Sequence, residues 1–562
     1  MKKINQLLII SLLSLSTFAQ EIEKEKINFN GGFESNSQWY LNDNGLRDEF
    51  DNPTMQPEQP LRSNSYLFLN FKYKKWSAGI QGESYMENAL LNLNPKYDGA
   101  NVATYFLQYR NDKIDVTAGY FYEQFGSGLL FRSWEDRALG INNALRGGRV
   151  IFKPTKYITL KSIYGNQRTG FDVTKSVVYG ADTEIILSDI FRLETYDVSL
   201  GLTFVARDEK TDIVNPNFDD VTNAFAARIN VNHDSFYLSS EFNYKTEDAV
   251  VQTPGIIDNN LIKPGNALLL NLGYSKKGFG IDASFRRLEN MSFFSERAAK
   301  GNTFNDKIMN FIPSLTKQHH YNLANIYVYQ PQPNVSIADV NFVKAGEIGA
   351  QIDVFYDFKK GSKIGGKYGT KVALNASNWN ALGGTFYLFT PQDYTTDFFG
   401  FGKRMYADYN IEITKKWSPK LQSIFSYINQ YYNKKFIEDA IGEVNTNIVA
   451  AEATYKFTST QSIRVMGEHM WADYDKKNWA GATVEFNINS KFSMYVSDLY
   501  NYGNDLEYAQ NHYYNVGGAF RKKSTRIALN YGRQRGGLVC VGGVCRFVPE
   551  SSGVSLSLNT SF

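Results

Sequence analysis

The sequence predicts an all-β fold, a single transmembrane antiparallel β-barrel of about 24 strands, within a range of about 22 to 26. Three observations support this prediction. Strand-like segments of about ten residues alternate apolar and polar side chains with period two. Short and long connections alternate along the chain, which is typical of a barrel with short periplasmic turns and long extracellular loops. After residue 19, no apolar run approaches the roughly 20 residues that a membrane-spanning helix needs.

The composition is consistent with this fold class. The 562 residues carry a formal net charge of +3, so we expect no nucleic-acid partner. Aromatic residues make up 15% of the chain, with 37 Tyr and 40 Phe, and these residues suit strands and membrane interfaces. The mean hydropathy of −0.37 does not argue against a membrane barrel, because only every second strand residue faces lipid.

The N-terminus has the features of a secretory signal. Lys2 and Lys3 precede a short apolar core, Leu7 to Leu15, and small residues suitable for cleavage follow it. We therefore expect a signal peptide at 1–19 and a mature barrel at 20–562 in the Gram-negative outer membrane, with both termini periplasmic. The first strand is expected so soon after cleavage that no plug domain fits before it.

The connections follow a regular order. Tight turns such as Lys74-Lys75 and Asn111-Asp112 alternate with longer polar stretches. The longer connections are expected at 41–62, 87–101, 123–148, 208–221, 247–265, 289–345, 379–402, 433–446 and 500–511.

The strands between these connections have one apolar and one polar face. In Thr222 to Val231, for example, Phe225 and Ile229 alternate with Arg228. An apolar outer face and a polar inner face distinguish a membrane barrel from a soluble one, which packs its apolar face inward. The inward charges that we expect to set pore selectivity are Arg228, Asp282, Arg286, Asp353, Asp408 and Glu485.

The last strand is predicted at Gly553 to Phe562, and its apolar face comprises Val554, Leu556, Leu558 and Phe562. In a closed barrel this strand pairs with the first and leaves no free edge. The ending resembles the closing strand of Gram-negative outer-membrane barrels, in which the terminal aromatic residue is part of the signal read by the barrel-assembly machinery.

The first candidate constriction is the segment from Phe125 to Arg149. Ser133 followed by Asp136 predicts the start of a short helix that ends at about Leu145. The segment either folds into the lumen, where its charges narrow the pore, or forms a surface helix whose charges pair with one another. Its candidate constriction residues are Arg132, Glu135, Asp136, Arg137, Arg146 and Arg149.

The second candidate is 289–345, which is far longer than a connection requires. It covers the mouth, hangs into the pore or docks a partner. His319-His320 is only a weak metal signal, because neighbouring strand residues face opposite ways. We expect no metal site, no cofactor and no enzymatic activity. The chain has 5 His and none lies in a catalytic motif, so catalysis ranks below transport and binding.

The segment Cys540-Val541-Gly542-Gly543-Val544-Cys545 predicts a two-residue hairpin. Val541 then lies opposite Val544, and Cys540 opposite Cys545 at a non-hydrogen-bonded pair, where side chains approach most closely. In an oxidising compartment this favours a disulfide that stiffens the tip of the last extracellular hairpin. A free thiol pair and a metal clip are the alternatives.

Three stretches resemble an uncharacterised family of outer-membrane barrels from gliding and gut-type Gram-negative bacteria. They are 126–148, PSLTKQHH from Pro313 to His320, and RGGLVCVGGVC followed by Arg546 and Pro549. The resemblance implies a single outer-membrane barrel and supplies no activity or site residues.

The leading prediction is an outer-membrane channel for polar solutes, porin-like and partly closed by inward-folded loops. The first alternative is an accessory subunit of a larger secretion or uptake complex in the outer membrane, and the minor alternative is a barrel hydrolase. The expected partners are outer-membrane lipids, the barrel-assembly machinery during insertion and, for the accessory role, an outer-membrane protein.

Overall fold

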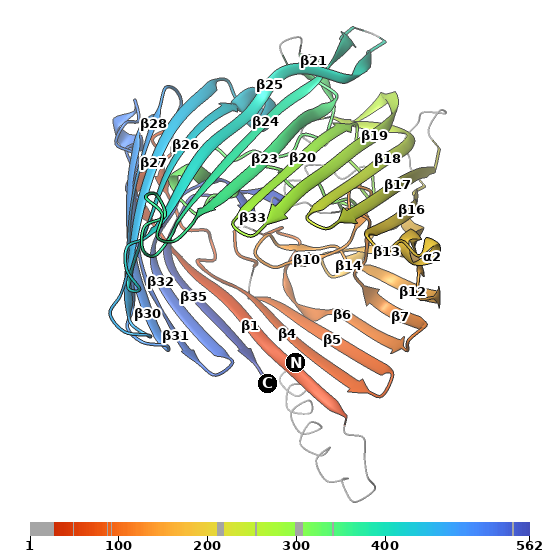
Figure 1. Ribbon diagram of the computed structural model, residues 1–562, viewed down its shortest axis with the longest axis horizontal. Helices are drawn as coiled ribbons and strands as arrows, with labels where there is room; N and C mark the ends of the chain where they lie inside the picture. The colour runs from red at the N-terminus through yellow and green to blue at the C-terminus, as the bar shows by residue number, and fades with distance from the viewer. Residues whose placement is uncertain are drawn as a thin grey trace, which may run out of the picture.

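The computed structural model has one closed antiparallel barrel of 24 strands (Figure 1). It describes residues 27–562 apart from 49, 87, 92, 211–218, 253–255, 298–306, 340–341, 390 and 542–543. The predicted signal peptide lies outside the described residues. In ring order the strands are β1 (Asn28–Leu41), β4 (Leu61–Tyr73), β5 (Trp76–Met86), β6 (Gly99–Arg110), β7 (Ile114–Phe121), β12 (Leu145–Thr155), β13 (Ile158–Thr169), β15 (Val177–Ile186), β16 (Tyr196–Asp208), β17 (Val221–His233), β18 (Phe236–Gln252), β19 (Ile256–Lys276), β20 (Phe279–Glu289), β23 (Gly346–Phe358), β24 (Thr370–Tyr387), β25 (Asp393–Lys416), β26 (Leu421–Asn433), β27 (Glu443–Lys456), β28 (Ser462–Ala472), β29 (Trp479–Asn487), β30 (Phe492–Tyr500), β31 (Asn515–Lys522), β32 (Thr525–Gln534) and β35 (Ser551–Ser561).

The barrel closes through β1 and β35, which confirms the predicted pairing of the first and last strands. The register runs from Gly32 opposite Ser561 to Leu41 opposite Ser552. Two backbone hydrogen bonds of 2.9 Å between Gly31 and Phe562 extend the ladder to the last residue. The Phe562 side chain is 61% exposed, and its ring centroid lies 6.2 Å from that of Phe29 on the same outer surface.

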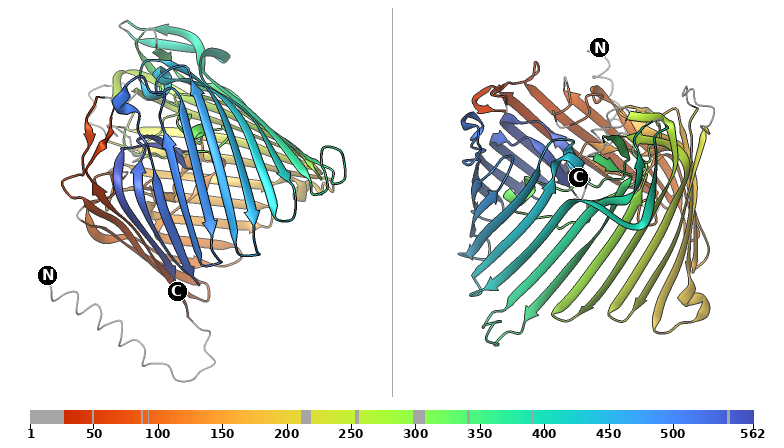
Figure 2. Two further views of the ribbon diagram at one scale, coloured as in Figure 1. Left: turned by 90° about the vertical axis from the view of Figure 1, so that its left-hand side faces the viewer. Right: turned by 90° about the horizontal axis from the view of Figure 1, so that it is seen from above.

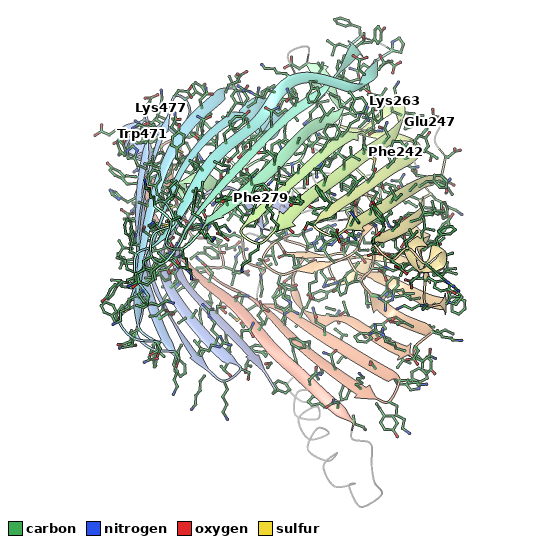
Figure 3. All side chains as sticks on the ribbon, in the orientation of Figure 1. Phe242, Glu247, Lys263, Phe279, Trp471 and Lys477 are labelled. Atoms are coloured by element: carbon green, nitrogen blue, oxygen red, sulfur yellow. The ribbon has the colours of Figure 1, made fainter. Side chains whose placement is uncertain are left out.

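The two faces of the wall differ as period-two alternation predicts. On β17, Phe225 and Ile229 are 46% and 40% exposed, whereas Arg228 between them is largely buried and ion-paired. Phe242 and Trp471, labelled in Figure 3, are 42% and 47% exposed on β18 and β28. So much exposed aromatic and aliphatic surface is unfavourable in water and is stable against lipid, so the outer band is a membrane-spanning surface.

The tight turns gather at one end of the barrel, together with the longer connections 187–195 and 359–369, and the other long connections lie at the opposite end. Both Asn28 and Phe562 lie at the end that carries the turns (Figures 1 and 2). Two of the expected long loops, 247–265 and 379–402, are largely strand extensions. The β18–β19 and β24–β25 pairs continue their ladders past the point where the adjacent strands on either side end. Continuing the ladder satisfies backbone groups that an irregular loop would leave to water.

The helix predicted from Ser133 to about Leu145 is wrong. Two short ladders take its place, β8 (Gln124–Phe125) with β9 (Phe131–Arg132) and β10 (Glu135–Asp136) with β11 (Ile141–Asn142). The Ser133 hydroxyl accepts a hydrogen bond from Glu123 N (2.9 Å), so it does not cap a helix. The Asp136 carboxylate accepts from Leu139 N (3.0 Å) in a turn. Among the described residues, no helix combines the length and apolar character needed to cross a bilayer.

Candidate functional site

Three chain segments pack against the inner wall of the barrel. They are residues 122–144 (the strap), the described residues of 290–345 (the long segment, without 298–306 and 340–341), and the paired strands β33 (Gly537–Val541) and β34 (Val544–Val548) (the C-terminal hairpin). Figure 1 draws β10 and β33 within the outline of the ring. Main-chain bonds join the strap to the long segment, from Arg132 N to Met309 O (2.8 Å) and from Phe311 N to Gly128 O (2.9 Å).

The strap bridges distant parts of the wall. At one end, Arg137 Nη1 lies 2.8 Å from Glu34 Oε2 on β1, and its guanidinium lies over the Tyr66 ring at 4.5 Å. At the other end, the Ser127 amide and hydroxyl donate to Glu241 on β18 at 2.8 and 2.9 Å. Ring order places β18 ten strands from β1 (β4, β5, β6, β7, β12, β13, β15, β16, β17, β18). The strap therefore crosses the interior between nearly opposite walls.

The other strap charges are also engaged. Glu135 Oε1 accepts from Gln81 on β5 (2.9 Å) and lies 3.2 Å from Arg137 Nε. The guanidinium of Arg132 lies 3.9 Å from the ring centroid of Phe311. These contacts favour the inward-folded interpretation of the segment over the surface helix.

Two predicted charges at the C-terminal end of this region lie on opposite faces of β12. Arg149 points inward and binds Asp115 (3.3 Å) and Glu123 (3.4 Å). Arg146 is three residues away on a strand with regular register, so it lies on the other face, where it is exposed.

The long segment is anchored on a buried ion pair of the wall. Arg286 on β20 and Glu347 on β23 pair at 2.5 Å, with side chains 1% and 0% exposed. Arg286 donates to Pro313 O at 2.6 Å, and Glu347 accepts from Gln332 N at 2.7 Å and from the Tyr329 hydroxyl. Arg286 was predicted as a pore charge, and the structure places it under the segment as an anchor.

Further along, the long segment binds successive inward carboxylates of β25, β27 and β28. His319 Nε2 lies 2.9 Å from Asp408, His320 lies 3.4 Å from Glu452, and Leu323 N donates to Glu468 at 2.9 Å. Aromatic packing seals this side of the interior. The Tyr329 ring stacks on the rings of Trp379 (5.7 Å) and Tyr406 (5.2 Å) within a buried cluster that reaches β29.

The remaining predicted pore charges also have partners. Arg228 binds Asp182 at 2.7 Å, and Glu485 binds Arg464 at 2.9 Å. Asp282 and Asp353 lie directly opposite each other on β20 and β23. Asp282 accepts from the Tyr237 hydroxyl, and Asp353 accepts from amide groups of neighbouring side chains.

Sequence reasoning missed several buried anchors on the same inner faces. Glu83 pairs with Arg168 at 2.5 Å, with both side chains almost fully buried, and Asp248 pairs with Arg207 (2.8 Å) and Arg297 (2.6 Å). The residues of this group that lie in wall strands have no sequence signal beyond their strand position, which they share with charges that face water, and Arg297 of the long segment has none.

Two sizeable cavities lined by described residues lie beside the inserted segments. The larger one, of about 480 Å³, lies along the inner faces of β4, β5, β6, β7 and β12. Its polar wall includes Gln81, Thr104, Gln108, Thr117 and Arg149. The smaller one, of about 220 Å³, lies between the long segment, Tyr406 of β25 and the β32–β33 connection.

The C-terminal hairpin has the predicted register. Cys540 lies opposite Cys545 and Val541 opposite Val544, whereas the Gly542-Gly543 turn and the Cys540 side chain lie outside the described residues. The disulfide therefore stays a prediction. The expected position at an outer tip is wrong, because Cys545 is 3% exposed with Sγ 3.7 Å from Tyr329 O. The hairpin is an insertion between β32 and β35, which pair directly, and its buried side chains among the described residues are Cys545, Arg546 and Val548.

Burial perturbs the pKa values of several cations in the inserted segments and in the connections beside them. It lowers the pKa of Lys344 to about 7, with Glu347 and Asp439 opposing the shift, and that of Arg546 to about 10. Burial also lowers the pKa of Arg535 and of Lys476, and these two cations act unfavourably on each other.

The histidines occupy structural contacts. His233 stacks on Tyr196, His469 Nε2 lies 2.8 Å from the Tyr502 hydroxyl, and His512 lies 2.7 Å from Asp498. Within the described ranges, no group of three or more His, Cys, Asp and Glu side chains is placed to hold a metal ion.

The fold and interior define a class: a transmembrane β-barrel whose inner wall carries inserted segments of its own chain. The chain belongs to the family of unknown function DUF6029, whose model matches residues 1–562. No curated protein matches it.

Solved structures with a similar fold have low sequence identity. The siderophore receptor PirA from Pseudomonas aeruginosa is 6% identical at a TM-score of 0.41, covering 96% of this chain and 81% of that one. The P pilus usher PapC translocation pore is 9% identical at a TM-score of 0.41, and the match covers 95% of this chain and 99% of that one. The copper transporter OprC is 10% identical at a TM-score of 0.40, and the match covers 97% of this chain and 82% of that one.

Proposed function

We propose that this protein is an outer-membrane channel for small polar solutes, partly closed by the strap and the long segment. The observation that carries the proposal is the asymmetric interior. The contacts of the long segment cover inner faces between β20 and β28, whereas β4 to β7 and β12 line the 480 Å³ cavity with both polar and aromatic side chains. A solute would pass along this less occupied wall, and the strap would set the narrowest point.

The cavity lining supports small, polar and weakly charge-selected solutes. Its cations are neutralised by nearby carboxylates, since Arg110 and Arg149 share Asp115 and Arg137 binds Glu34 and Glu135. Amide and hydroxyl groups of Gln108, Thr104 and Thr117 provide the rest of the polar surface. Such a lining exchanges hydrogen bonds with a hydrated solute and gives little preference for either sign of charge.

Cysteine accessibility tests the route. In a C540S/C545S background, Thr104→Cys places a thiol on the cavity wall, and Tyr105→Cys places one on the outer face, where Tyr105 is 49% exposed. In planar bilayers, a charged methanethiosulfonate reagent is expected to reduce the conductance of T104C several-fold and to leave Y105C unchanged. Bilayers that stay silent with folded protein would overturn the channel proposal.

A second candidate function, an accessory subunit of a larger outer-membrane complex, rests on the rim. Residues 382–404 of the β24–β25 hairpin extend past the neighbouring strands, and Phe389, Phe399 and Phe401 are 88%, 64% and 58% exposed. Exposed aromatic groups of this density favour a protein partner. Silent bilayers, together with a stoichiometric partner that is lost on changing Phe389 and Phe399 to Ser, would favour this function.

The proposed location is the Gram-negative outer membrane, with the turn end and both termini periplasmic and the barrel-assembly machinery acting at insertion. The signal peptide at 1–19 and the Cys540–Cys545 disulfide belong to this proposal. Mature protein isolated from the outer-membrane fraction should begin near residue 20 and migrate differently on gels before and after boiling. An unprocessed N-terminus or a heat-insensitive mobility would contradict it.

A further inference from the structure

We propose that the smaller cavity, of about 220 Å³, is a binding site for a small anion that carries a carboxylate, phosphate or sulfate group. The cavity lies between the long segment and the connection from β32 to β33. Its ionisable side chains are Lys317, His319, Arg535 and Tyr406, and no carboxylate is among the residues that line it. Lysine and arginine only donate hydrogen bonds, and an anionic group only accepts them.

Arg535 is the cation of the cavity lining that has only neutral close partners among the described residues. Its guanidinium donates to Asn325 O (2.9 Å) and Gly536 O (3.0 Å), so its partners among the described residues are neutral carbonyl oxygens. Burial lowers its pKa, while Glu550 and Glu438 act on it favourably from a distance. Arg535 is partly buried and has no ion-pair partner among the described residues, so an anion in the adjoining cavity would supply its counterion.

A second cation lies near Arg535. Lys476 is partly buried, and desolvation together with repulsion from Arg535 lowers its pKa, while Asp475 and Glu438 oppose the shift. Glu550 interacts favourably with both cations and accepts a hydrogen bond from the Tyr513 hydroxyl at 2.5 Å. None of these three carboxylates is among the residues that line the cavity, so the ionisable groups on the cavity wall remain basic or neutral.

The basic residues Lys317 and His319 are held in place by contacts with the barrel wall. Lys317 Nζ donates to Asn410 Oδ1 (3.1 Å) and lies 3.7 Å from Glu412, and His319 Nε2 lies 2.9 Å from Asp408. These partners belong to the wall strand β25, whereas Lys317 and His319 line the cavity on the opposite side. These wall contacts fix the two side chains at the cavity lining, and a fixed lining reduces the entropic cost of binding.

Size and neutral groups narrow the ligand class. A volume of about 220 Å³ corresponds to roughly seven water molecules at about 30 Å³ each. Inorganic phosphate, sulfate or a short dicarboxylate fits this volume, and a polymer does not. Ser314, Thr316 and Gln318 add uncharged donors to the lining.

Calorimetry on the full-length barrel in detergent tests this site without any measurement of flux, so its result is independent of the channel proposal. Inorganic phosphate, sulfate and succinate are titrated at fixed ionic strength, with glucose as a neutral control. We expect saturable binding of at least one anion and none of glucose. If no anion binds to folded wild-type protein, the proposal is overturned.

Two variants and a matched control locate the binding. Arg535→Gln removes the buried charge and is expected to weaken binding at least tenfold. Leu538→Trp keeps every charge and fills the cavity, so it should abolish binding even if R535Q folds poorly. Arg526→Gln removes an exposed cation near the other end of β32 and should bind like wild type. Unchanged affinity in folded R535Q and in L538W would place the anion elsewhere and refute the site.

Discussion

The two sides of the barrel interior have the same wall pattern but different contents. On β20 to β28, inward carboxylates bind the long segment, and Trp379, Tyr406 and Tyr329 form a dry aromatic cluster. On β4 to β7 and β12, polar side chains such as Gln108 and Thr117 and aromatic ones such as Phe106 line an open cavity. The comparison shows that an inward charge in a wide barrel has one of two roles, anchoring the chain's own loops or facing solvent. Perturbing each side separately tests whether the difference is functional.

The largest effect is expected from Glu347→Gln. Glu347 accepts hydrogen bonds from Arg286, Tyr329 and Gln332 N, so its loss leaves a buried guanidinium without its counterion. Breaking a buried pair from one side costs about 3–5 kcal/mol. We expect the long segment to lose that much docking free energy, measured as lower hydrogen-exchange protection at 313–332, together with a higher single-channel conductance.

Glu485→Gln is the matched control for this prediction. Glu485 also faces inward, but its side chain is 41% exposed, and Arg464 keeps its second partner Glu452. The expected cost is below about 1 kcal/mol, as for other solvent-exposed pairs. Equal protection losses in both variants would mean that anchoring and solvent-facing charges do not differ.

A smaller effect is expected at the strap. Glu241→Gln weakens two hydrogen bonds from Ser127, a contact worth about 1–3 kcal/mol because the acceptor is charged and buried. Protection should fall at 126–132 and not at 313–332, because the long segment keeps its own anchors on β23 to β28. A parallel loss at 313–332 would show that the two inserted segments dock as one unit.

The barrel wall was largely predictable because its physical determinants are local. Period two places Phe225 and Arg228 on opposite faces whatever the rest of the chain does, and closure of β1 on β35 follows from the need to pair both edges. The resemblance to a family of outer-membrane barrels predicted the same barrel fold and supplied no functional residues.

The interior was less predictable because its determinants are non-local. Ser133 and Asp136 have the spacing of a helix start, yet their side chains hydrogen-bond to Glu123 N and Leu139 N in a segment pinned between the wall and the long segment. Arg286 and Asp282 have the same period-two signature, and only the position of Pro313 and Tyr329 makes the first an anchor. The alternating pattern of a strand does not indicate which connection folds back and packs against its inner face.

The smallest effect concerns the pH dependence of the long segment. Lys344, in β22 (Phe342–Lys344), has a pKa lowered by burial to about 7, against an ordinary value of 10.5. Between these two pH values the docked state binds fewer protons than the released state, so docking strengthens as pH rises, by up to about 1.4 kcal/mol per pH unit. Protection factors at 329–345, corrected for intrinsic exchange, should therefore increase from pH 7 to pH 8. Lys344→Met has no titrating group and should remove this slope, although it also removes the donor to Gln332 and Phe436 O. If the protection factors of K344M depend on pH as those of wild type do, a group other than Lys344 controls the pH dependence of docking. Lys344 would then not lose its proton on docking as its burial implies.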